Sequence, residues 1–156
     1  MKEGTGFKGK IDVEVRDYLG NIKQEQHFPN TITNLFDEHV AARLAGQDSN
    51  IISWMAVGSG TGQDASDVTL ANLLSIVALS GAVGSVVQLT GANDNDIQGI
   101  GYWEAGVGTG SITEAGLFRY SGTSLGSMAA YNDAISVQKG ESDTLTITWT
   151  ITCGSS

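Results

Sequence analysis

Cysteine, proline and histidine are nearly absent from this sequence of 156 residues, which contains one cysteine, one proline and two histidines. The single cysteine, Cys153, excludes an internal disulfide, so we expect a fold that does not depend on an oxidising compartment. His27 and His39, with one distant cysteine, do not have the spacing of a zinc site. We therefore expect no metal and no cofactor.

Charged residues are scarce as well, at 16% of the chain against about 25% in a typical domain. With 8 basic and 17 acidic residues, the formal net charge is -9 at pH 7. This balance argues against nucleic acid and anionic membranes as partners, because both are bound by clustered Lys and Arg.

Long apolar runs are missing too, and the first residues lack the pattern of a signal peptide. We expect a soluble protein that is used without secretion by a signal peptide.

The few basic residues are unevenly placed. Five of them fall within the first 23 positions: Lys2, Lys8, Lys10, Arg16 and Lys23. This pattern has two interpretations. The basic residues form either the solvated face of a strand or an arm that docks on an acidic neighbouring subunit.

The clearest pattern in the chain is the alternation from Thr144 to Thr152. Large apolar residues fall on one side of this segment and threonines on the other: Leu145, Ile147, Trp149 and Ile151 against Thr144, Thr146, Thr148, Thr150 and Thr152. A period of two predicts a β-strand with one buried face, which needs a second layer to cover it. The uncharged threonine face offers little protection against pairing with another chain.

The 21 glycines indicate many tight turns between short strands. We predict a hairpin from residues 7–16 and 22–28, and one helix near residues 34–45 with Asn34 as its cap, Gly46 as its terminator and Leu35, His39, Ala42 and Leu44 near one side. Further strands are expected at residues 51–57, within 68–79, and at 85–89, 98–105, 111–120, 125–130 and 143–152. The pattern is typical of one antiparallel β-sandwich domain, jelly-roll-like, with residues 1–8 as an extended N-terminal arm.

Two glycine motifs suggest catalysis, but neither has the context that the chemistry requires. Residues 4–10 match the spacing of a phosphate-binding loop, yet Ile11 follows where a magnesium-binding Ser or Thr should stand, and a strand follows where a helix should begin. Residues 122–126 read GxSxG without a strand-to-helix turn, and both histidines come earlier in the chain. Glu104 and Glu114 flank a glycine loop but have no known separation that would support a glycosidase pair. We expect no catalytic residues.

Two binding alternatives stay open. The oxygen-rich segment 93–96, Asn-Asp-Asn-Asp, is typical of a solvated turn, and as a calcium site it lacks the expected Gly and bidentate Glu. Five aromatic residues could line a sugar-binding face of the kind found on β-sandwich modules: Trp54, Tyr102, Trp103, Tyr120 and Tyr131. Tyr102 and Trp103 are neighbours and would face opposite ways in a strand, so at least one of them should be in the core.

Three stretches in order resemble small virion proteins of tailed bacteriophages. The first is the GxGT motif at residues 57–61, followed by D-x-x-L from Asp67 to Leu70. The second is the strand-like segment 112–118, and the third is the terminal Thr/Ile strand from Leu145 to Ile151. Together they span about the last two thirds of the chain. The resemblance implies a phage structural protein of jelly-roll type, similar to capsid cement (decoration) proteins, head fibres and tail-collar or baseplate modules.

Among these roles, cement fits best, because a fibre usually needs a repetitive or coiled shaft and this chain has neither. The resemblance then implies a virion location on the capsid surface after assembly in the host cytoplasm, with the major capsid protein and sister copies in a homotrimer as partners. We expect Lys2, Lys8 and Lys10 to contact the capsid, and Thr146, Thr148 and Thr150 to contact sister subunits. The alternatives are a neck, collar, tail or fibre component, and a carbohydrate-binding module.

Overall fold

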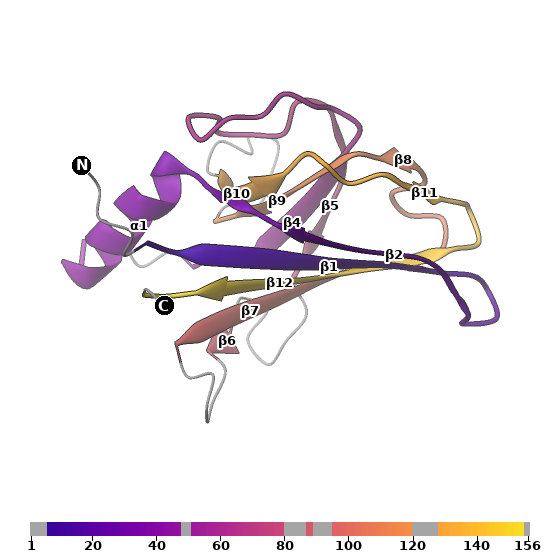
Figure 1. Ribbon diagram of the computed structural model, residues 1–156, viewed down its shortest axis with the longest axis horizontal. Helices are drawn as coiled ribbons and strands as arrows, with labels where there is room; N and C mark the ends of the chain where they lie inside the picture. The colour runs from indigo at the N-terminus through magenta and orange to yellow at the C-terminus, as the bar shows by residue number, and fades with distance from the viewer. Residues whose placement is uncertain (1–5, 48–50, 80–86, 89–94, 120–127, 155–156) are drawn as a thin grey trace.

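A computed structural model describes residues 6–47, 51–79, 87–88, 95–119 and 128–154 of the chain (Figure 1). In these residues the elements are strands and one helix, in this order: β1 Lys8–Arg16, β2 Ile22–Pro29, β3 Thr31–Ile32, α1 Asn34–Leu44, β4 Trp54–Gly58, β5 Leu73–Ala78, β6 Val87–Gln88, β7 Asp96–Trp103, β8 Gly110–Ile112, β9 Glu114–Phe118, β10 Met128–Asn132, β11 Val137–Lys139 and β12 Thr144–Thr152. The predicted mainly-β fold with one short helix is confirmed.

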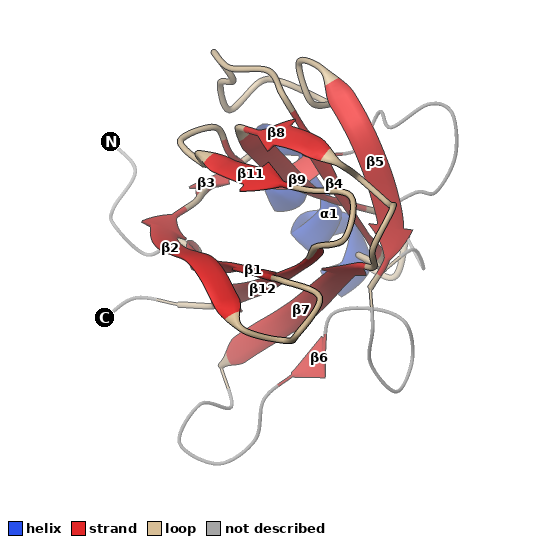
Figure 2. Cartoon of the chain, turned by 90° about the vertical axis from the view of Figure 1, so that its right-hand side faces the viewer, coloured by secondary structure: helices blue, strands red, loops and turns tan. Residues whose placement is uncertain are grey.

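The strands form two antiparallel five-stranded sheets and a small two-stranded ladder. The first sheet has the order β2-β1-β12-β7-β6, the second has the order β3-β10-β9-β4-β5, and β11 pairs with β8. Figure 2 looks along the strands of the first sheet and shows the two layers facing each other, with α1 at the far end. The β1–β2 turn lies at the end opposite to α1 (Figure 1). The architecture is therefore a β-sandwich.

The alternating pattern of β12 has the predicted consequence. Its four large apolar residues are at most 1% exposed and lie in the main core, between the two sheets. They pack with the inward residues of β1 and with Met55, Val57 and Leu117 of the second sheet. Since β12 pairs with both β1 and β7, it lies inside the first sheet, and its threonines share the outer face with residues of those two strands.

The helix α1 closes one end of the sandwich, but its contacts differ from the prediction. Its buried residues are Phe36 and His39, whereas Leu44 is 85% exposed. The cap residue is Thr33 rather than Asn34, and the Thr33 hydroxyl donates to the carbonyls of Met128 and Ala129 instead of capping the helix. The chain leaves the helix through Gly46, which has a φ of +70° and so adopts the left-handed conformation that favours glycine.

One predicted strand is divided in the structure. The segment 111–120 contains β8 and β9 with Thr113 between them, because the Thr113 hydroxyl donates to the Gly60 carbonyl and its backbone N–H donates to the Gly58 carbonyl. The short strands β3 and β11 were not predicted. Two- and three-residue strands carry too little periodicity to be recognised from sequence.

Candidate interaction surfaces

A buried carboxylate, that of Glu114, organises the outer side of the second sheet. Glu114 is fully buried in β9, and the loop of residues 59–72, called here the signature loop, folds over it. The carboxylate accepts four hydrogen bonds from this loop: Gly60 N at 2.9 Å and Asn72 N at 2.7 Å to Oε1, and Ala71 N at 3.0 Å and Gln63 Nε2 at 2.7 Å to Oε2. Such bonds to a charged acceptor offset the cost of burying the carboxylate.

The signature loop is held at further points by residues of β10 and the segment after it. The Asp133 carboxylate accepts the backbone N–H groups of Gly62 and Gln63, each at 3.0 Å, and the Tyr131 hydroxyl donates to the Gln63 carbonyl at 2.9 Å. Leu70 is 4% exposed and lies in a second, smaller core on the outer face of the sheet, with Ala56, Phe118, Met128 and Tyr131. The loop therefore acts as a fixed cover of the second sheet.

The two glycines of the GxGT motif are required by this packing. A Cβ on Gly58 would lie 2.4 Å from the Asn72 carbonyl oxygen, and a Cβ on Gly60 would lie 2.4 Å from Ala71 Cβ and 2.7 Å from Glu114 Oε1. These distances are far below van der Waals contact, so only glycine fits there. Two of the stretches that carry the phage resemblance thus meet at Glu114 and serve the fold.

Glu104 lies away from this arrangement and is exposed at the end of β7. Its backbone carbonyl accepts a hydrogen bond from the Lys139 ammonium group, at an N–O distance of 3.0 Å. Lys139 is fully buried, and this burial lowers its pKa against the opposing effect of the Asp143 carboxylate. Asp143 in turn bonds Lys23 Nζ at 2.7 Å, which together with the Gly140 N–H lowers the pKa of the carboxyl. This chain of contacts connects β2, β7 and β11 structurally.

The outer face of the first sheet carries the threonine row expected to contact sister subunits, and is called here the threonine face. Thr146 and Thr148 are half-buried and open to this face. Thr150 is only 5% exposed and accepts a bond from Gln98 Nε2 at 3.2 Å, and Thr152 donates to the Asp96 carboxylate at 2.6 Å. The accessible part of the row therefore lies around Thr146 and Thr148, toward the β1–β2 turn.

Lys8 and Lys10 are both exposed and border the threonine face, opposite Thr152 and Thr150 in the ladder. Lys2 lies outside the described residues. Residues 7 and 8 belong to the folded body rather than to an extended arm, because Lys8 begins β1 and Phe7 packs edge-on against Phe36 with ring centroids 4.8 Å apart. The two lysines are thus presented from a rigid strand.

A charged cluster occupies the same face toward the edge strand β2. His27 Nδ1 lies 2.6 Å from Asp12 Oδ1, and His27 Nε2 lies 3.2 Å from Glu25 Oε1. The bond to Asp12 is the main cause of a raised pKa at His27. The imidazole is exposed, so salt and pH act on it directly.

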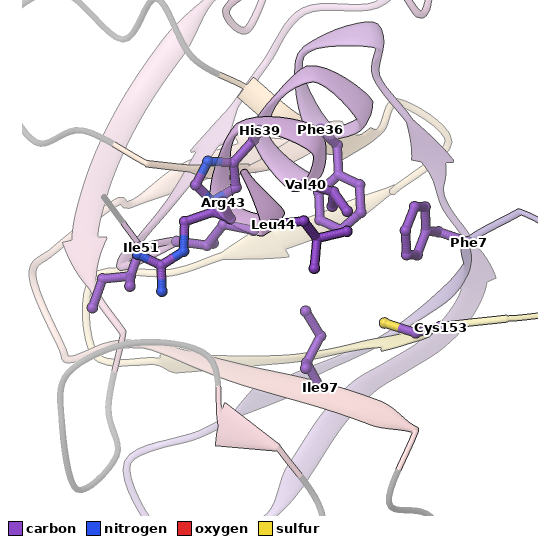
Figure 3. A pocket seen from close by; sticks show the side chains of 10 residues that line it. Phe7, Phe36, His39, Val40, Arg43, Leu44, Ile51, Ile97 and Cys153 are labelled. Carbon is purple, nitrogen blue, oxygen red and sulfur yellow. The ribbon is translucent and has the colours of Figure 1, made fainter. Parts of the chain in front are cut away.

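An apolar pocket of about 280 Å³ opens between α1 and the nearby ends of β1, β7 and β12 (Figure 3). Its walls are mainly aliphatic and aromatic side chains: Phe7, Phe36, Val40, Leu44, Ile51, Ile52 and Ile97; His39, Arg43 and Cys153 also line it. Burial raises the pKa of the Cys153 thiol, with a smaller effect from Asp96 in the same direction. A thiol with a raised pKa is less deprotonated at neutral pH and is therefore a poor nucleophile there.

The aromatic residues considered for sugar binding do not form a common face in the described structure. Trp103 is fully buried and Tyr131 is 6% exposed, whereas Tyr102 is half exposed on the threonine face and Trp54 packs against the smaller core. Tyr120 lies outside the described residues. Adjacent Tyr102 and Trp103 face opposite ways, as predicted.

The described residues were also compared with what a metal site or a membrane-spanning helix requires. Within them, no three His, Cys, Asp or Glu side chains gather in a way that could hold a metal, and no helix is long and apolar enough to cross a membrane. Of the 93–96 segment, Asn95 and Asp96 are described: Asn95 Nδ2 donates to the Cys153 carbonyl, and Asp96 accepts the Thr152 hydroxyl. Asn93 and Asp94 lie outside the described part.

Comparison with known proteins found no matching family model, no matching curated protein and no matching solved structure. The proposed function therefore rests on the surfaces described above. Sequence reasoning missed the roles of Glu114 and Lys139. A signal for Glu114 was present, because a lone acid inside the apolar strand segment 112–118 must either face solvent or find buried donors.

Proposed function

We propose that the chain is a non-enzymatic structural subunit of a tailed-phage virion, which binds the outer capsid surface and stabilises the shell as a cement protein. The observation that carries the proposal is the threonine face with Lys8 and Lys10 at its border. A rigid row of hydroxyl groups suits repeated contacts with like subunits. The two exposed lysines suit an acidic site on the shell.

The mechanism requires only binding. A ligand that binds the assembled shell and not its dissociated subunits stabilises the shell by RT ln(1 + [L]/Kd), about 2.7 kcal/mol at a concentration one hundred times Kd. The rigidity of the contact surface supports this role, because strands that are already ordered lose little conformational entropy on binding. The homotrimer expected from the resemblance is part of the proposal.

The lysine contact is tested with point variants, because removal of residues 1–10 would also delete the start of β1 and the Phe7 contact with Phe36. Lys8→Gln with Lys10→Gln should weaken binding of the purified protein to shells stripped of it, measured by co-sedimentation, by about tenfold or more. Thr61→Glu with Thr69→Glu is the control, since it changes the net charge equally on exposed positions of the signature loop. Equal binding of both variants would contradict the lysine contact.

The competing role is a neck, collar or tail component, which the same resemblance implies. Counting copies per particle by quantitative mass spectrometry separates the two roles. A cement subunit should be present in hundreds of copies, and a collar or tail component in a few to a few dozen. Carbohydrate binding gains no support from the described aromatic residues, because they are dispersed between the core and different faces.

A further inference from the structure

The strand β5 is an edge of the second sheet. In the described part of the chain it pairs with β4 alone, over the register from Trp54↔Ala78 to Gly58↔Leu73. Figure 2 shows β5 at the margin of its layer. The outer side of an edge strand presents N–H and C=O groups that can pair with another strand.

The other sheet edges differ from β5 in length or in composition. On the β2 side, the Gln24 and Gln26 side chains bond the backbone of β11 and its neighbour: Gln24 with Gln138 N and O, and Gln26 with Ser136 N and O, at distances from 2.8 to 3.1 Å. The edge strands β3 and β6 have two residues each, whereas β5 has six. Among the described edges, β5 is the longest without a charged residue or a proline, since β2 contains Lys23, Glu25 and Pro29.

The residues of β5 lack the usual protection against edge pairing. Natural edges carry Lys, Pro or other charges that block a second strand. β5 reads Leu-Leu-Ser-Ile-Val-Ala, and residues 68–93 around it contain no charged residue and no proline. Leu73 is 44% exposed and Leu74 is 41% exposed. The edge combines a hydrogen-bonding template with exposed apolar side chains.

The neutrality of this edge indicates the partner. Two copies of a chain with a net charge of -9 repel each other over most orientations, but β5 itself adds no charge to a contact between them. A partner of opposite charge would need charged groups to recognise, and β5 offers none. An antiparallel pair of identical strands is also self-complementary about a two-fold axis.

We propose that β5 is a self-association edge, at which the β5 strands of two copies pair antiparallel and join their second sheets into one continuous sheet. Two six-residue edges bury less than a standard interface, so the contact is weak for free protein and strengthened wherever copies are held close together. The inference does not depend on the proposed function. On a shell it would be a two-fold contact between neighbouring trimers, distinct from contacts within a trimer.

The test measures the mass of the full chain by sedimentation velocity over a series from about 1 to about 500 µM, the range in which weak contacts are populated. The wild-type mass should double as concentration rises. Leu74→Lys should weaken this association at least about tenfold, because it brings a charge into the paired edge. Leu44→Lys, the same change at a more exposed leucine on α1, should leave it unchanged. Circular dichroism and thermal melts check that both variants fold.

Hydrogen exchange of the β5 amides locates the contact. Protection of residues 73–78 should increase with concentration in the wild type and in Leu44→Lys but not in Leu74→Lys. A mass that does not double, an association that Leu74→Lys leaves unchanged, or β5 amides whose exchange is independent of concentration would overturn the proposal. If the wild-type protein binds shells but fails these tests, β5 pairing would be refuted and the proposed capsid role would still stand.

Discussion

The carboxylate of Glu114 accepts the backbone N–H of Asn72 at 2.7 Å, which ties the centre of the second sheet to the far end of the signature loop. The same oxygen accepts the N–H of Gly60 at the near end of the loop. One buried side chain thus closes a loop of residues 59–72 over the sheet.

Replacing Glu114 with glutamine should destabilise the fold strongly. The glutamine amide NH₂ would face two of the loop donors that now bond a carboxylate oxygen, leaving buried donors without an acceptor. Loss of charged hydrogen bonds and desolvation of the donors should lower the free energy of unfolding by about 3 kcal/mol or more. Urea denaturation measures the change. Glu104→Gln removes the same charge at an exposed position and should stay within about 0.5 kcal/mol of wild type.

Leu70→Ala should show that the signature loop contributes a core of its own. Leu70 is 4% exposed among Ala56, Phe118, Met128 and Tyr131, so truncation leaves a cavity and should cost about 2–4 kcal/mol of unfolding free energy. Leu44→Ala is the matched control, because Leu44 is largely exposed and its loss should change stability by less than about 0.5 kcal/mol. Equal losses in the two variants would contradict a fixed cover.

His27 should titrate above its usual pKa of 6.5, mainly because of its bond to Asp12. Because the pKa is raised in the folded state, folding favours the protonated imidazole, and protonation of His27 stabilises the fold. This contribution to stability is full below pH 6.5 and is lost as the pH rises through the folded-state pKa. The NMR midpoint of the His27 ring should lie above 6.5 and fall toward it in Asp12→Asn. Glu141→Gln, an exposed change of equal charge away from this pair, should leave the midpoint in place. A midpoint unchanged by Asp12→Asn would refute the pairing.

The glutamine contacts between β2 and β11 should stabilise the side of the sandwich on which these two strands lie. Gln24→Ala with Gln26→Ala removes four hydrogen bonds to the backbone of Ser136 and Gln138. Because the bonds are exposed and water can replace them, the loss should be only about 1–2 kcal/mol in total. Amide exchange at Ser136 and Gln138 should accelerate selectively, whereas exposed Gln47→Ala should have no effect there. Unchanged exchange at the two amides would argue that the contacts do not form in solution.

Strong periodicity made much of the fold predictable. The β1–β2 hairpin, β12 and α1 appear close to their expected positions, because alternation and turn residues act over neighbouring residues. The helix face was predicted less well: Leu44 was expected on the same side as His39, yet His39 is buried and Leu44 is exposed. The sequence of α1 has only a weak apolar stripe, so the position of the sheets decided which residues were buried.

The candidate surfaces were predicted only in part. The lysines at positions 8 and 10 are exposed, as a contact surface requires, but Phe7 anchors the start of β1 in the core. Thr150 shares the alternation of Thr146 and Thr148, yet it is covered, because Gln98 on the neighbouring β7 reaches across to its hydroxyl. Strand alternation fixes the face on which a residue lies but does not fix what a neighbouring strand places over it.

The sequence by itself determined the class of the fold, the apolar side of β12 and the scarcity of charge around β5, since these follow from the order of side chains along the backbone. Only the tertiary structure decided that Glu114 is buried, that the signature loop covers the second sheet, and that β5 lies at an edge of that sheet among the described strands. Those features arise from contacts between residues far apart in the sequence, such as Gly62 and Asp133, which are 71 positions apart. Such pairings depend on the packing of whole sheets, which local periodicity does not specify.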